Sequence, residues 1–137
     1  MEINSPSSDH SLGIVEMDST HNEFLVACEQ LKTASSSEFV QQFAALVDHT
    51  RDHFNNENRL MEESGFPPIQ IHQGEHARVI GELEQAVDHL KQNENAFEHG
   101  AMVDGLLEWF EMHLRTMDAA LAGHLRNVNH PAASNGA

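Results

Sequence analysis

Four short motifs along this chain carry histidine and carboxylate side chains of the kinds that ligate metal ions. In two of them the side chains stand four residues apart, as His53 with Glu57 and His72 with His76. Residues i and i+4 lie on one side of an α-helix, so each pair presents two ligands to one point in space. A fold that satisfies all four motifs must therefore bring several helices around a common centre. The full set is His21, His53, Glu57, His72, His76, His113 and Asp118.

The size of this ligand set indicates two metal ions. Five imidazoles and two carboxylates are too many for one metal ion and too few to complete two octahedra. Their nitrogen and oxygen donors suit iron. The pattern is therefore typical of a two-metal centre with one open position, which is a site for a small molecule.

The composition favours one helical domain, spanning residues 1–137. Hydrophobic residues make up 39% of the 137 positions, enough for one moderate core. Leu, Ala, Glu, Gln and Met dominate the periodic stretches, and these residue types favour helices. The net charge of −15, with only seven lysines and arginines, argues against binding to nucleic acid or to anionic membranes.

The chain shows no targeting or membrane segment. Its apolar runs are too short to span a bilayer, and its N-terminus lacks the basic and apolar regions of a secretory signal. The single cysteine, Cys28, cannot form an internal disulfide, which fits a reducing compartment. We therefore expect a cytoplasmic protein without membrane insertion, whose protein partner the sequence does not identify.

Periodicity and breaker residues predict four helices, at about residues 18–34, 37–64, 70–91 and 96–125. Short connections between neighbours imply an all-α fold, an antiparallel up-and-down four-helix bundle. The segments outside the helices are expected to form a flexible N-terminal arm at about residues 1–12 and a disordered C-terminal tail at about residues 127–137.

Several helix ends carry recognisable signals. Asp18 or Ser19 is expected to cap the first helix, and Ser35 with Glu38 forms a capping box for the second. Gly65, followed by two prolines, ends the second helix. The inward face of the third helix is expected to carry Ile80, Leu83, Val87 and Leu90.

The last motif departs from helical spacing. His113 and Asp118 stand five residues apart, which is about 140° of rotation in a regular α-helix and aims them at different neighbours. Either the carboxylate reaches around from its flank, or the helix is locally widened. We expect a π-type turn or a similar distortion between them, because such bulges often occur at functional sites.

Each motif alone is weak evidence. Among eleven histidines, about one pair spaced by four residues is expected by chance, and the chain has two, His49/His53 and His72/His76. His49 is therefore a rival ligand, about 6 Å from His53 along the helix axis. It is the combination of motifs that is specific. The other histidines are expected to be ordinary surface or capping residues: His10, His89, His99, His124 and His130.

As a set, the motifs resemble those of the hemerythrin family in its bacterial single-domain form. The likeness covers about residues 12–125, and all seven ligand positions hold the expected residue types in the expected order. The matching stretches are Leu12-Gly-Ile14, Met17-Asp18-x-x-His21, His53-Phe-x-x-Glu57, Leu60-Met61, Phe66-Pro67, His72-x-x-x-His76 and Trp109-Phe110-x-x-His113-x-x-x-x-Asp118. Two departures are visible. Such proteins commonly carry a tryptophan in the N-terminal arm, and they often place a smaller aliphatic residue where Phe110 stands beside the oxygen pocket.

The resemblance implies two iron ions joined by an oxo or hydroxo bridge, and reversible binding of dioxygen for carriage, storage or buffering. It assigns His72, His76 and His113 to one ion, His21 and His53 to the other, and Glu57 and Asp118 to both. Only the second ion then has an open position, so dioxygen is expected to bind beside His21 and His53. Apolar side chains within one turn of the ligands are expected to line that pocket: Phe24, Leu25, Phe54, Trp109, Phe110, Leu114 and Met117.

Other functions of the same residues stay open. The centre could turn over peroxide or nitric oxide as an enzyme, or its oxidation could be sensed by a separate partner chain. A zinc or single-metal site is disfavoured, since zinc prefers tetrahedral cysteine and histidine sites without bridging carboxylates. Ferritin-like centres use Glu-x-x-His pairs, and no histidine here has a glutamate three residues before it. A non-enzymatic oxygen-binding protein is the leading expectation.

Overall fold

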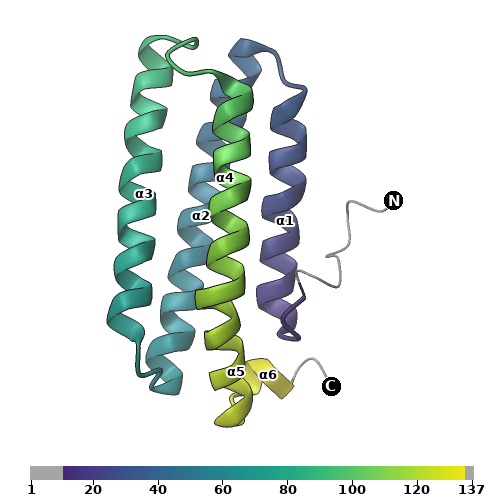
Figure 1. Ribbon diagram of the computed structural model, residues 1–137, viewed down its shortest axis with the longest axis vertical. Coiled ribbons are helices and arrows are strands. Elements are labelled where there is room, and N and C mark those ends of the chain that lie inside the picture. Colours follow the sequence, from purple (N-terminus) through teal and green to yellow (C-terminus); the bar gives the residue numbers. More distant parts are fainter. Residues whose placement is uncertain (1–10, 135–137) are drawn as a thin grey trace.

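The structure is a computed structural model that describes residues 11–134. Its long helices run alternately up and down the molecule (Figure 1), and those residues contain no strand. The predicted all-α, antiparallel up-and-down four-helix bundle is therefore confirmed. No helix in the described part is both long and apolar enough to cross a bilayer. The four long helices are α1 (Val15–Lys32), α2 (Ser36–Ser64), α3 (Ile69–Gln92) and α4 (His99–His113).

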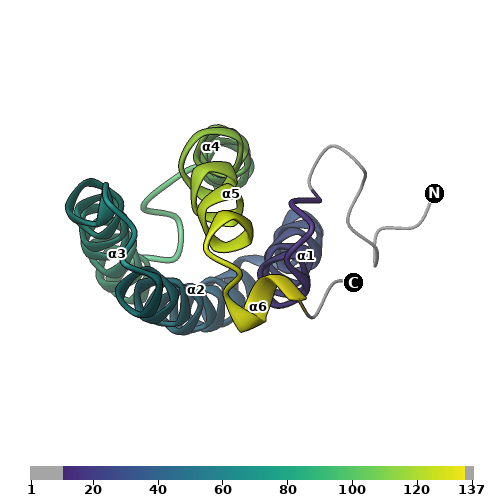
Figure 2. The same ribbon diagram turned by 90° about the horizontal axis from the view of Figure 1, so that it is seen from below.

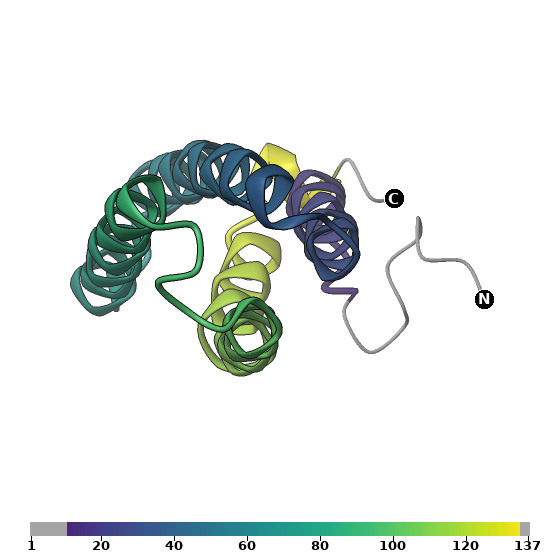
Figure 3. The same ribbon diagram turned by 90° about the horizontal axis from the view of Figure 1, so that it is seen from above.

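The helices are arranged as an incomplete ring. Seen along the bundle axis, α3, α2 and α1 form a curved row, and α4 stands on the concave side of this row (Figures 2 and 3). α2 packs against α1 and α3, and α1 also packs against α4. Between α3 and α4 the side chains leave a surface pocket. Further surface pockets lie between α1 and α2 and between α2 and α3.

The start of α1 differs from the prediction. The helix begins at Val15, three residues early, because Asp18 does not cap it. The carboxylate of Asp18 instead accepts hydrogen bonds from the backbone N–H groups of Leu12 (2.8 Å) and Gly13 (3.1 Å). These bonds fix the chain ahead of the helix, where Ile14 is fully buried. This part of the arm therefore packs on the bundle without a tryptophan.

The other helix ends follow from their capping residues. The predicted capping box of Ser35 and Glu38 starts α2, and Gly65 ends it in the left-handed conformation with φ of 65°. α4 begins at His99, three residues later than expected, because the side chain of Glu98 accepts hydrogen bonds from the first backbone N–H groups of the helix. The capping hydrogen bonds of Glu98 therefore set the start of α4, although the apolar pattern of the sequence extends further back.

α4 runs into a π-helical turn, η1 (Leu114–Asp118), and the helix then continues as α5 (Ala119–Asn127). The predicted distortion between His113 and Asp118 is therefore confirmed. A π turn is wider than an α turn because its hydrogen bonds span five residues, so side chains five apart come to one side. Both His113 and Asp118 are buried and face the bundle interior.

Part of the expected C-terminal tail is ordered, so that prediction is wrong for the described residues. A short helix, α6 (Pro131–Ser134), follows α5. Ala132 is only 4% exposed and belongs to the same apolar cluster as Ile14 and Leu125. The reason is that α6 covers apolar surface that the four long helices leave open at this end. The rest of the expected arm and tail lies outside the described residues, at positions 1–10 and 135–137.

Two apolar clusters fill the bundle, and a layer of polar side chains lies between them. Along α1, Met17 belongs to one cluster and Phe24 to the other, with the buried His21 between them. Polar groups buried in this way are costly unless they are paired or bind a ligand. The buried polar side chains of the described residues are His21, Thr50, His53, Glu57, His72, His76, His113 and Asp118.

α3 is less completely buried than its sequence pattern indicates. Ile80 and Leu83, expected to face inward, are only partly buried, whereas the neighbouring Val79 is buried. Leu83 lines the pocket between α3 and α4, and Ile80 lines a second pocket between α2 and α3. The pattern therefore identifies the inner side of α3 but not how far α3 stands from α4.

Candidate metal centre

The structure brings all seven predicted ligands to the centre of the bundle. One comes from α1, two from α2 and two from α3, and the remaining two are His113, the last residue of α4, and Asp118, the last residue of η1. Each is between 1% and 8% exposed. Their nitrogen and oxygen atoms form two groups, and within each group the atoms lie within 4.8 Å of one another. One group is Glu57, His72, His76, His113 and Asp118, and the other is His21, His53, Glu57 and Asp118.

Both carboxylates belong to both groups, because each divides its two oxygens between them. Oε1 of Glu57 lies 3.3 Å from Nε2 of His76, whereas Oε2 lies 3.4 Å from Nε2 of His21. Oδ1 of Asp118 lies 3.2 Å from Nε2 of His113, whereas Oδ2 lies 3.1 Å from Nε2 of His21. Each carboxylate thus has one oxygen near histidines of the first group and the other oxygen near His21 of the second group. This is the arrangement that bridging carboxylates need.

Many of these donor atoms lack a hydrogen-bond partner. A buried polar atom left unpaired costs about 1–3 kcal/mol. Here the unpaired atoms of each group lie within 4.8 Å of one another and all offer electron pairs, which fits bound cations. The residues present therefore fit a pair of metal ions. The atoms without a partner include Oε1 of Glu57, both carboxylate oxygens of Asp118, and Nε2 of His72, His76 and His113.

Neighbouring side chains orient the imidazoles. Nδ1 of His76 lies 2.9 Å from Oδ1 of Asn58, so the Nδ1–H group donates to the amide oxygen and the Nε2 lone pair faces the centre. Phe54 stacks on the same imidazole with ring centroids 3.9 Å apart, and Trp109 stacks on His113 at 4.8 Å. Rings held on one face and at one nitrogen cannot easily rotate, so the site is preorganised.

We expect the hydrogen bond between Asn58 and His76 to strengthen metal binding. Asn58→Leu removes the acceptor for Nδ1–H of His76, and loss of such an outer partner typically weakens metal binding about 10- to 100-fold. Competition with a coloured chelator measures this affinity. The matched control is Asn55→Leu, an exposed asparagine on the same helix, which should leave the affinity unchanged. Equal affinities for both variants would show that Asn58 does not orient the ligand.

The two carboxylates, Glu57 and Asp118, favour positive charge on the buried His21. Burial lowers the pKa of His21, but the nearby carboxylates of Asp118 and Glu57 outweigh this effect and raise the pKa to about 9. Burial raises the pKa of Asp118 and of Glu57, but the surrounding histidines bring both pKa values below their usual range. Both carboxylates are therefore ionised. A proton and a metal ion compete for Nε2 of His21, so metal uptake at this atom releases a proton.

A narrow cavity borders the group that has only two histidines. Its volume is about 10 Å³, room for about one water-sized molecule. Four of the seven residues that the sequence suggested for a ligand pocket line it: Phe24, Phe54, Trp109 and Phe110. The other three lie elsewhere. Leu25 and Leu114 pack in the apolar core, and Met117 lines a separate surface pocket with Ile71 and His72.

Sequence reasoning missed three polar residues around the centre. Thr50, three residues before His53 on α2, lines the cavity. Asn58 holds a histidine ligand candidate, and Glu75 accepts a hydrogen bond from the indole N–H of Trp109 at 3.0 Å. Each stands next to a ligand candidate or within one turn of it. Asn58 and Glu75 contact residues on other helices, which the sequence does not reveal. Closeness in sequence to a ligand candidate was the only signal that could have identified these three residues.

The remaining described histidines lie away from the centre. The rival candidate His49 belongs to neither group, and its partly exposed ring lies 3.4 Å from a carboxylate oxygen of Glu23. Nε2–H of His124 donates to the carbonyl oxygen of Ser64 at 2.8 Å, and that of His99 donates to a backbone carbonyl beside the start of α4. These histidines secure helix ends. His10 lies outside the described residues.

Comparison with known proteins agrees with this geometry. Residues 12–125 match the family described as the Hemerythrin HHE cation binding domain. Over 107 residues the chain is 32% identical to a bacteriohemerythrin from Ralstonia nicotianae, an alignment that covers 78% of this chain and 77% of that protein. The family match extends from the arm to α5 and includes every ligand candidate. The chain therefore belongs to the hemerythrin HHE cation-binding family.

Proposed function

We propose that the seven residues of this centre hold two iron ions joined by an oxo or hydroxo bridge, and that the chain binds dioxygen there reversibly, as a carrier, store or buffer. One observation carries the proposal. Glu57 and Asp118 each direct one oxygen to the group with three histidines and the other oxygen to the group with two. Carboxylates shared in this way suit two neighbouring cations, and the nitrogen and oxygen donors suit iron.

The unequal histidine count supports a place for dioxygen. With two shared carboxylates and a shared bridge, three histidines complete an octahedron around one ion, whereas two histidines leave one position open around the other. The open position would lie on the side of His21 and His53, the two histidines of the smaller group. These two residues also form part of the wall of the narrow cavity. A small ligand in that cavity would therefore meet the ion that has room for it.

The cavity wall favours reversible binding over chemistry on a substrate. Bound iron supplies the electrons that dioxygen accepts on binding and returns on release. Apart from the ligand candidates, four aromatic rings and Thr50 line the cavity. The hydroxyl of Thr50 donates to the backbone carbonyl of Leu46 at 2.7 Å. Apart from the ligand candidates, the wall is therefore mostly apolar and includes no carboxyl or imidazole group that could deliver protons for peroxide turnover.

An optical spectrum tests the proposal. Iron-loaded protein in air should show the near-ultraviolet bands of an oxo-bridged ferric pair and a visible band that disappears on deoxygenation and returns in air. Metal analysis on the same sample should return two irons per chain. Sustained consumption of peroxide or nitric oxide at high turnover would instead indicate an enzyme, and zinc in place of iron would contradict the oxygen-binding function.

Phe110 is expected to control how well the cavity excludes water. Its ring stacks on Phe24 with centroids 4.8 Å apart and meets His21 edge-on at 5.5 Å. Phe110→Leu removes part of this wall and should speed autoxidation of the oxygenated protein about tenfold, equivalent to ~1.4 kcal/mol in the barrier. The decay of the visible band measures the rate.

A buried phenylalanine far from the cavity provides the control for this variant. Phe39→Leu truncates a fully buried ring that stacks on His99, so it should cost similar stability without changing autoxidation. If Phe110→Leu altered neither the autoxidation rate nor the oxygen affinity, Phe110 would have no role in the cavity.

A further inference from the structure

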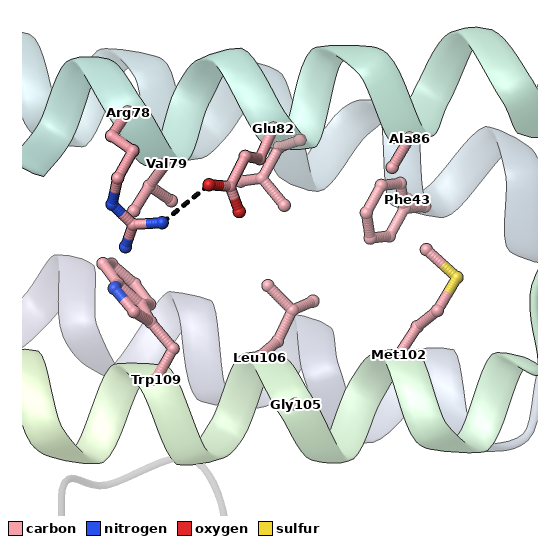
Figure 4. Close-up of a pocket in the computed structure, with 10 residues that line it drawn as sticks. Phe43, Arg78, Val79, Glu82, Ala86, Met102, Gly105, Leu106 and Trp109 are labelled. Atoms are coloured by element: carbon pink, nitrogen blue, oxygen red, sulfur yellow. Dashed lines mark hydrogen bonds and ion pairs between the residues drawn. The ribbon is translucent and has the colours of Figure 1, made fainter.

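A larger pocket opens on the surface between α3 and α4, with a volume of about 300 Å³. Figure 4 shows side chains of the two helices facing each other across it, with the ring of Trp109 directed toward Arg78. Arg78 donates a hydrogen bond to Glu82 at 2.7 Å, so its positive charge is paired with a carboxylate at the pocket. The rest of the wall is mostly apolar and includes Phe43, Val79, Leu83, Ala86, Met102 and Leu106.

Trp109 lines both this pocket and the narrow cavity at the metal centre. On the inner side its ring stacks on His113, with centroids 4.8 Å apart and planes at 20°. It also meets Phe54 edge-on at 6.1 Å. On the outer side it faces the groove between α3 and α4. The indole is therefore the partition between the surface pocket and the metal centre.

A hydrogen bond across the groove holds this partition in place. Nε1–H of Trp109, on α4, donates to Oε2 of Glu75, on α3, at 3.0 Å. Glu75 is fixed in turn, because Arg78 donates to both of its carboxylate oxygens at 3.0 and 2.9 Å. The ring is thus tied to the opposite helix by one bond whose acceptor cannot move freely. Without that bond, the contacts of the indole with His113 and Phe54 remain to hold it, and it can rotate while both helices stay in place.

We propose that dioxygen reaches the metal centre through the pocket between α3 and α4, and that Trp109, latched to Glu75, is the gate on this route. The inference rests on the proposed function, because it takes dioxygen as the ligand. An uncharged apolar molecule enters an apolar groove more readily than water or ions do. Rotation of a partly exposed side chain is also fast compared with helix movement. A side-chain gate therefore admits the ligand without opening the bundle.

A rival route exists on the other side of α3. The pocket between α2 and α3 has a volume of about 210 Å³ and reaches Phe54, which also lines the narrow cavity. Phe54 is stacked closely on His76, at 3.9 Å, which leaves its ring little freedom. The pocket is also more polar, since its wall includes Arg51, Asn55, Asn58 and Gln73. Both features favour the route past Trp109 for an apolar ligand.

Matched variants can block each route separately. Gly105 lines the α3/α4 pocket, and a Cβ atom there would meet nothing within 4 Å, so Gly105→Leu fills the pocket from a helix position that tolerates a side chain. Ala77→Leu does the same in the α2/α3 pocket, where Ala77 is exposed. Neither residue contacts the metal centre. Glu75→Ala removes the acceptor that holds Trp109.

Stopped-flow oxygenation of the iron-loaded chain measures the first effect. Gly105→Leu should slow dioxygen association and dissociation together by about tenfold, equal to ~1.4 kcal/mol in the barrier, with the affinity unchanged because the bound state is not altered. Ala77→Leu should match the wild type. Glu75→Ala should speed both rates, by about threefold or more, because the closed position of the gate is weakened.

Fluorescence provides a readout that does not depend on oxygenation. Trp109 is the only tryptophan and the chain has no tyrosine, so quenching by dissolved oxygen reports how easily oxygen reaches the gate. With all proteins in the same metal state, Gly105→Leu should lower the quenching constant and Ala77→Leu should not. If the wild type showed no reversible oxygenation but this pattern held, the proposed function would fail and the access route would stand.

Three outcomes would overturn the inference. Unchanged association and quenching in Gly105→Leu would show that oxygen does not pass through the α3/α4 pocket. Slower association in Ala77→Leu would place the route between α2 and α3. Unchanged rates in Glu75→Ala would show that the hydrogen bond from Trp109 to Glu75 does not control the entry of dioxygen.

Discussion

The Glu57→Gln variant is expected to hold fewer than two iron ions per chain and to lose the reversible visible band. Glutamine keeps the volume of the side chain but offers one oxygen where Glu57 offers two. Its amide nitrogen cannot ligate the second ion and would direct its N–H groups at that cation. Because the two oxygens of Glu57 face different groups of histidines, the substitution removes a ligand from one ion and the carboxylate charge from both.

Iron analysis by mass spectrometry, against protein concentration, measures this result. Glu63→Gln is the control, since Glu63 is an exposed carboxylate on the same helix that pairs with Arg59, and this variant should keep both ions. Two irons and an unchanged spectrum in Glu57→Gln would show that Glu57 does not bridge the metal ions.

Removing the metal ions is expected to lower the thermal midpoint of unfolding by more than about 10 °C, which corresponds to a few kcal/mol for a domain of this size. Metal bound only by the folded chain adds its binding free energy to stability. Without it, the buried carboxylates and imidazoles keep atoms that have no hydrogen-bond partner. Calorimetry before and after reduction and chelation gives the difference.

The matching control is His49→Gln, which changes a histidine one turn from His53 that pairs with Glu23 outside the centre. This variant should show the same loss of stability on chelation as the wild type. A chelated protein that metal analysis shows to be iron-free, but that melts at the original temperature, would contradict the prediction.

The convergence of the seven ligand candidates could be predicted from the sequence because helix geometry is local. Spacing of four residues places His72 and His76 on one side of α3 whatever the rest of the chain does. The same rule failed for His113 and Asp118, and that failure itself predicted the π turn that is observed. The ends of α2 followed for a similar reason, since a capping box and a left-handed glycine act within a few residues.

Features that depend on distant contacts could not be predicted. Hydrogen bonds between Asp18 and the arm start α1 early, and contacts of Ala132 with the far end of the chain order α6. The roles of Asn58 and Glu75 depend on which helix lies opposite. The position of Leu114 in the core instead of the cavity follows from the π turn, which rotates the side chains that come after His113.

X-ray diffraction from crystals of the iron-loaded chain, recorded at the iron absorption edge, tests the central claim most directly. The account predicts two anomalous peaks, both contacted by Glu57 and by Asp118, with one position beside His21 and His53 that no side chain fills. A single peak, or two ions completely surrounded by side chains, would contradict it.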